Sequence, residues 1–155
     1  MKSVIADPDK LIRLLYYSRA SDEVQRRPSP HIHEILSVAV PKNTEAALTG
    51  ALLYCDGWFV QALKGARTTV GAVFGLIGAD RRHGAVTQIS ASLIHQRAFG
   101  AWSMCGATLS PSDDAIVKVL ENNQGFHPDR QPPMSLFKLL KTVVAIKDRD
   151  GALLI

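Results

Sequence analysis

The sequence predicts an α+β fold, a single sheet with helices against both of its faces. Leu52 to Gly65 is typical of two apolar strands joined at Asp56-Gly57, a residue pair that favours a tight hairpin turn because both positions tolerate positive φ. Apolar residues at helical spacing occur before and after this hairpin. Strands and helices therefore follow one another along the chain.

The second strand of the hairpin is apolar on both sides. Because side chains alternate along a strand, Phe59, Gln61 and Leu63 share one side, and Val60 and Ala62 share the other. We expect a central strand that is covered twice. A buried amide without hydrogen bonds costs roughly 2 to 7 kcal/mol, so Gln61 needs partners.

The first strand is predicted over Leu11 to Tyr17, and a helix is predicted over Ser29 to Val40. Ser29 is expected to cap this helix, Pro41 to end it, and Asn43 to lie in the loop that follows. One face of the first strand carries Ile12, Leu14, Tyr16 and Ser18.

The second half repeats the strand, helix and strand order. A helix is predicted over Arg67 to Gly78, followed by the loop DRRHG, a strand from Val86 to Ile94 and a strand from Ala101 to Leu109. Trp102 and Met104 share one face of the last strand. Two such halves in tandem indicate a ferredoxin-like βαββαβ sheet with an added fifth strand and both helices on one face.

The C-terminal region predicts two more helices. The first begins at Ser110 and runs through Leu120, and the second carries Leu136, Phe137, Leu140, Val143 and Val144. We expect these helices to pack on the opposite sheet face or to contribute to a subunit contact, with the apolar residues 152–155 docked as well. The chain is thereby divided into a domain over 10–110 and a helical extension over 111–155.

The composition is that of an ordinary globular domain, with 155 residues, 46% hydrophobic and 21% charged. The formal net charge is +4, but the basic residues occur in short pairs such as Arg26-Arg27, without interleaved aromatics, so nucleic-acid binding is not predicted. No signal peptide or membrane-spanning run is seen, which predicts a cytoplasmic protein without a membrane partner.

Common catalytic and metal motifs do not occur in the sequence. His31 and His33 are two residues apart and would point to different sides of a helix, and Cys55 and Cys105 lie in apolar surroundings typical of small hydrophobes. GxSxG, P-loop and GxGxxG patterns are missing, so an enzyme is not predicted.

The candidate site is a group of polar and aromatic residues that border the two-helix side of the sheet. Taken singly, most have an ordinary structural explanation, as core aromatics, turn residues or a loop salt bridge. Gln61 is the exception because an interior strand is a poor place for an unpaired amide. The group comprises Tyr16, Ser18, Asn43, Gln61, Asp80, Arg82, His83, Trp102 and Met104.

Together these residues form an ordered signature that resembles a known family. The motifs are YYS from Tyr16, N-x5-TG from Asn43, FVQALKG from Phe59, DRRH from Asp80 and R-x-F-x-x-W-x-M from Arg97. They resemble the BLUF domain, a flavin-binding blue-light sensor, over the region from about residue 11 to residue 109, in the manner of its short stand-alone members.

The resemblance implies non-covalent FAD between the two helices of the predicted domain. Tyr16 is then the electron and proton donor to the photoexcited flavin, and Gln61 bridges Tyr16 and the flavin. Asn43 holds the edge of the ring, while Trp102 and Met104 carry the change in the glutamine to the sheet. The remaining cofactor-binding residues are Ser18, Asp80, Arg82 and His83.

The resemblance also implies a change in binding to a downstream signalling protein, and we expect a homo-oligomer. The family usually has glutamate where this chain has Lys64, and tryptophan or valine where it has Ala62. Lys64 is expected at the surface, where it affects the choice of partner. Two alternatives are a non-photoactive interaction module and an acylphosphatase-like hydrolase; the second lacks a glycine-rich phosphate loop in SRASDEVQRR.

Overall fold

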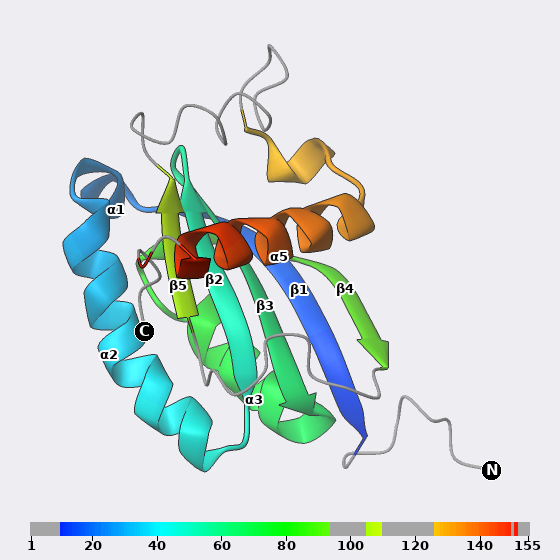
Figure 1. Ribbon diagram of the computed structural model, residues 1–155. Helices are drawn as coiled ribbons and strands as arrows, with labels where there is room; N and C mark the ends of the chain where they lie inside the picture. Colours follow the sequence, from blue (N-terminus) through cyan, green and yellow to red (C-terminus); the bar gives the residue numbers. More distant parts are fainter. Residues whose placement is uncertain (1–9, 94–104, 110–125, 150, 152–155) are drawn as a thin grey trace.

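A computed structural model describes residues 10–93, 105–109, 126–149 and 151. Its five-stranded sheet has the spatial order β4-β1-β3-β2-β5, in which β2 and β5 are parallel and the other neighbours antiparallel (Figure 1). The strands are β1 (Leu11–Ala20), β2 (Thr49–Cys55), β3 (Trp58–Ala66), β4 (His83–Leu93) and β5 (Cys105–Leu109).

The helices lie on both faces of the sheet, with α5 on one face and α2 and α3 on the other (Figure 1). They are α1 (Asp22–Arg26), α2 (Pro28–Glu45), α3 (Arg67–Gly78) and α5 (Pro133–Arg149), with a 3-10 turn at Pro128–Arg130. This layout confirms the predicted ferredoxin-like α+β sheet. Trp102, Met104, the helix predicted from Ser110 and residues 152–155 lie outside the described residues.

The hairpin at the centre of the sheet is confirmed. β3 pairs with β2 on one side and with β1 on the other, and the turn residues Asp56 and Gly57 have φ of 49° and 81°. The positive φ of Gly57 favours glycine, because a side chain there would strain the backbone.

Both faces of β3 are buried, as the alternation of apolar residues predicted. Phe59 and Leu63 pack with Ile32 and Leu36 of α2 and with Val70 of α3. This side of the sheet is one of two hydrophobic cores and holds the candidate site.

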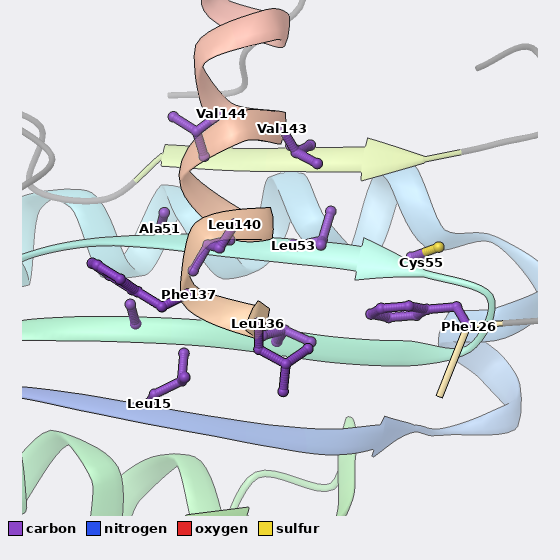
Figure 2. Packing of buried hydrophobic residues seen from close by; sticks show 13 residues of the cluster. Leu15, Ala51, Leu53, Cys55, Phe126, Leu136, Phe137, Leu140, Val143 and Val144 are labelled. Carbon is purple, nitrogen blue, oxygen red and sulfur yellow. The ribbon is translucent and has the colours of Figure 1, made fainter. Parts of the chain in front are cut away.

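The second core lies between the sheet and α5. The helix buries all five of its predicted core residues, Leu136, Phe137, Leu140, Val143 and Val144. Figure 2 shows them packed over Leu15, Ala51 and Leu53, with Cys55 at one end of the same cluster. Burial of Cys55 agrees with its predicted structural role.

Helix α2 differs from its prediction at both ends. Its first residue is Pro28, Arg27 is the N-cap without a side-chain hydrogen bond, and Ser29 lies inside the first turn. Proline suits this first position because its ring fixes the helical φ and its missing N–H has no intrahelical partner there. At the other end the helix passes through Pro41 to Glu45. Pro41 is exposed, so water can hydrate the carbonyl group that lacks an amide partner.

The strands also begin and end differently from the predictions. β1 continues through the polar residues to Ala20, and the short helix α1 follows at once, with Ser21 capping the amide of Val24. β2 begins at Thr49 and β4 begins at His83, both within predicted loops. Cross-strand pairing therefore extends beyond the apolar runs.

Lys64 corrects a further expectation. Its side chain is buried, with 1% exposure, and its Nζ lies 4.7 Å from the centre of the Phe137 ring. The predicted surface position was wrong because α5 covers this end of β3. Among the described helices, none combines the length and the apolar character needed to cross a bilayer.

Candidate functional site

A cleft lies between α2 and α3, above the sheet face opposite α5. It has a volume of about 180 Å³, and its walls are mainly apolar, with polar groups at one end. The lining residues are Ile35, Val38, Ala39, Lys42, Asn43, Leu52, Gln61, Leu63, Val73, Leu76, Ile77, Asp80, Arg82 and His83.

Gln61 joins the cleft to a buried tyrosine. It lines the cleft from β3, while Tyr16 is its direct partner across the β1–β3 ladder. The Tyr16 hydroxyl donates a hydrogen bond to Oε1 of Gln61. Tyr16 is completely buried, and this burial raises the pKa of its phenol well above the usual value, with a further rise caused by the Asp80 carboxylate. Tyr16 is therefore a neutral donor held behind the glutamine.

The turn after α3 holds Asp80 and Arg82 in a fixed pair. The backbone amide of Arg82 donates to Oδ1 of Asp80 at 2.9 Å, and its Nη2 donates to Oδ2 at 2.6 Å. Hydrogen bonds from the Arg82 side chain lower the pKa of Asp80, so its carboxylate stays charged. Nη1 of Arg82 also lies 3.7 Å from Oε1 of Glu34, which links the turn to α2.

His83, the first residue of β4, is largely enclosed. Its Nδ1 lies 2.7 Å from Oγ of the buried Ser18, and its ring centre lies 4.6 Å from that of Phe59. Desolvation by burial lowers the pKa of His83 to about 4, against the opposing effect of Asp80. The imidazole is therefore neutral near pH 7, and Ser18 positions it.

Asn43 lies in the last turns of α2, not in the loop that the sequence predicted. Because the helix continues past Pro41, Asn43 points into the fold with 3% exposure and lines the cleft. The backbone carbonyl of Asn43 accepts a hydrogen bond from the backbone amide of Leu48 at 2.8 Å, which fixes the turn into β2. Lys42 beside it is exposed and also lines the cleft.

The structure brings most of the predicted residues together. Tyr16 and Ser18 lie behind the cleft, where they hydrogen-bond Gln61 and His83. Trp102 and Met104 lie outside the described residues. The residues that line the cleft itself are Asn43, Gln61, Asp80, Arg82 and His83.

The apolar walls of the cleft are the part that the motifs missed. Val38 and Leu76 line it from α2 and α3 with 50% and 69% exposure, and both rank among the exposed large hydrophobic residues of the described chain. Phe74 of α3 packs against Tyr16, with ring centres 5.4 Å apart. Val73, Leu76 and Ile77 are apolar and follow helical spacing, so they share one face of α3. Leu76 on that face is exposed, and this is the feature from which the cleft wall could have been predicted.

This donor set fits a flat aromatic ring with polar edges. Facing apolar walls and a few placed hydrogen-bonding groups are typical of small-molecule sites, and exposed apolar side chains at the rim mark an interaction surface. An amide carries a donor and an acceptor on one planar group, so Gln61 can hydrogen-bond a ligand and Tyr16 together. The cleft therefore fits a flavin ring.

Comparison with known families gives a match over residues 11–105 to the family BLUF, described as sensors of blue-light using FAD. Among individual relatives, the photoactivated adenylate cyclase subunit beta of Euglena longa is 32% identical over 99 residues, 63% of this chain and 11% of that protein. The blue light- and temperature-regulated antirepressor of Escherichia coli is 30% identical over 113 residues, 72% of this chain and 27% of that protein. The chain thus spans a small part of these relatives.

Solved structures agree with this match over more of the chain. The BlsA photo-activated state superposes with a TM-score of 0.72 at 25% identity, covering 86% of this chain and 94% of that one. The dark state of BlrB, a BLUF protein, superposes with a TM-score of 0.71 at 27% identity, covering 91% and 99%. The matched region contains every residue that lines the cleft. The chain belongs to the BLUF family of blue-light sensors.

Proposed function

We propose that this chain binds FAD non-covalently in the cleft between α2 and α3 and responds to blue light through Tyr16 and Gln61. The observation that carries the proposal is the position of Gln61, which lines the cleft while its Oε1 accepts a hydrogen bond from the buried Tyr16. This pair lies within the region that matches a family of sensors using FAD.

Different residues of the cleft would contact different parts of the cofactor. Val38 and Leu76 would cover its two faces from α2 and α3. Asn43, rigid within its helix, would hydrogen-bond one polar edge, and the Asp80–Arg82 pair would line another approach. Lys42 is a cation at the cleft that could neutralise a phosphate group. Bound FAD would supply the absorption of blue light and an acceptor for an electron.

Tyr16 and Gln61 supply the change of hydrogen bonding. Tyr16 keeps its proton on the phenol oxygen, and that proton already lies on the hydrogen bond to Oε1 of Gln61. If Tyr16 donated an electron to the bound cofactor, its phenol proton would move along this hydrogen bond toward Gln61, and both electron and proton would return to Tyr16 when the cofactor is reoxidised. Rotation or tautomerisation of Gln61 then exchanges its donor and acceptor ends between Tyr16 and the cleft.

The signal would leave through the sheet and α5 toward a partner protein. Gln61 and Val60 are adjacent in β3 and face opposite sides, so a shift of this strand reaches the core beneath α5. A change in partner affinity needs about 1 to 3 kcal/mol of coupling, which one rearranged buried hydrogen bond can supply. The proposal assigns the sensor to residues 10–110, the output extension to 111–155, and a homo-oligomer to the assembled state.

FAD binding and flavin absorption, measured in the wild type and in two tryptophan variants, test the proposal. The purified protein should be yellow, release FAD on denaturation and show a reversible red shift of flavin absorption under blue light. Ala39→Trp fills the cleft and should abolish FAD binding, whereas Ala72→Trp, at an exposed position of α3 outside the cleft, should retain it. A colourless wild type after refolding with excess FAD would contradict the proposal and favour a module without cofactor.

A further inference from the structure

We propose a second ligand site, an oxyanion site for a phosphate group, beneath the first half of α5 on the sheet face opposite the cleft. Its cations are Arg13 of β1, Lys64 of β3 and Lys141 of α5, and Thr49 of β2 supplies a hydroxyl.

The three cations gather around one aromatic ring. The Arg13 guanidinium lies 3.7 Å from the centre of the Phe137 ring, Nζ of Lys64 lies 4.7 Å from it, and Nζ of Lys141 lies 5.7 Å from it. Figure 2 shows Phe137 directed toward the end of the sheet where β2 begins. The ring attracts each of these cations through its negative face.

Strand register places the polar groups in a row. Arg13 pairs with Lys64 across β1 and β3, and Lys64 pairs with Thr49 across β3 and β2. Cross-strand partners have Cβ atoms about 4.5 to 5.5 Å apart on one face of the sheet. A single bound anion can therefore contact all three side chains.

Two buried polar atoms of this row have no hydrogen-bond partner. They are Nε of Arg13 and Oγ1 of Thr49, a residue with 7% exposure. Within the described residues, Arg13 and Lys141 form no ion pair with a carboxylate either. Buried donors are satisfied in almost all folded proteins, so two such atoms beside clustered cations indicate a missing acceptor.

The electrostatics point the same way. Burial, together with the charges of Arg13 and Lys141, lowers the pKa of Lys64 to about 8. A dianion would offset this repulsion between the three cations. Donors from three strands and a helix surround the position, which suits the tetrahedral oxygens of phosphate better than a planar carboxylate. Lys141 is exposed, so the site is reached from solvent at the edge of α5.

The site is separate from the proposed flavin cleft. Gln61 and Lys64 are three residues apart in β3, so their side chains lie on opposite faces of the sheet. Free phosphate and phosphate monoesters share the same dianionic oxygens, so both are candidate ligands of the site.

Thermal unfolding with added phosphate tests the site. At a phosphate concentration about tenfold above Kd, and against chloride at equal ionic strength, the wild type should gain about 3 °C in Tm. Lys64→Met and Lys141→Met should each lose most of this gain. Lys138→Met removes the same charge from an exposed position of α5 outside the row and should keep it.

The ligand form is resolved by a parallel titration with O-phosphoserine. An equal gain in Tm assigns the site to phosphate monoesters in general, and a gain with inorganic phosphate alone assigns it to the free anion. An equal gain in chloride, or a gain kept in both Lys64→Met and Lys141→Met, would overturn the proposal.

Discussion

Tyr16 and Gln61 are directly opposite residues of β1 and β3, and the tyrosine hydroxyl donates a hydrogen bond to the glutamine carbonyl oxygen. The tyrosine is completely buried, whereas the glutamine reaches the cleft. A ligand that hydrogen-bonds Gln61 would therefore be linked to Tyr16 through an amide whose two ends have opposite hydrogen-bonding character.

Replacing Tyr16 with phenylalanine should keep the fold and the bound FAD but abolish the light-induced red shift. The ring still packs on Phe74, while the donor to Gln61 is lost. We expect a loss of about 1 to 2 kcal/mol in the free energy of unfolding, because Gln61 loses a buried partner. Absorption spectra before and after illumination, with urea unfolding, measure both effects. Tyr17→Phe, in the same strand on the α5 side, is the matched control and should shift normally.

The pKa of His83 predicts acid sensitivity below neutrality. The folded protein holds this imidazole at a pKa of about 4, and the unfolded chain near 6.5, so the unfolded state binds more protons between these values. Stability should fall by roughly 2 to 3 kcal/mol as the pH drops through this window. Urea unfolding across that range checks it. His83→Gln should remove much of this slope, and an unchanged slope in that variant would show that another group causes it.

The pKa of Lys64 predicts a change of stability at alkaline pH. Its pKa is about 8 in the folded protein and 10.5 ordinarily, so the unfolded chain again binds more protons in between. Stability without added phosphate should therefore rise as the pH increases from about 8 toward about 10. Unfolding curves of the wild type and Lys64→Met, compared at matched pH, separate the contribution of Lys64 to stability from that of tyrosine ionisation. Parallel pH profiles of the two proteins would contradict the assignment.

Packing of α5 should contribute strongly to stability. Leu140 is fully buried against the sheet, and Leu140→Ala should cost about 3 kcal/mol through lost burial and a residual cavity. Lys138→Ala, two residues earlier and on the exposed side of the helix, should change the free energy of unfolding by less than about 0.5 kcal/mol. If both substitutions have equal effects, α5 is not docked as described.

The sequence predicts the centre of the fold well because its signals there are local. Asp56-Gly57 defines the hairpin, and the two-sided apolar character of β3 requires cover on both faces, which α2 with α3 and α5 provide. Element ends were less predictable. Pro41 is compatible with a continuing helix when its side of the helix is exposed, and local propensity does not contain that information.

Several polar residues predicted to border the two-helix side do line the cleft, whereas positions that depend on tertiary packing were not predicted. Gln61 and Asn43 both line the cleft, although Asn43 does so from a helix and not from a loop. Lys64 was expected at the surface because it lies at the end of its strand, yet it is covered by Phe137, which belongs to a distant segment of the chain. Leu76 is an exposed leucine, and its place in the cleft becomes evident only when the opposite wall is known.

The most direct test of the account is the flavin absorption of Gln61→Leu before and after blue light. The variant should bind FAD, because the cleft walls remain, and should show no red shift, because leucine cannot exchange a donor for an acceptor. Gln88→Leu, an exposed glutamine of β4, should shift like the wild type. A normal reversible red shift in Gln61→Leu would contradict the account.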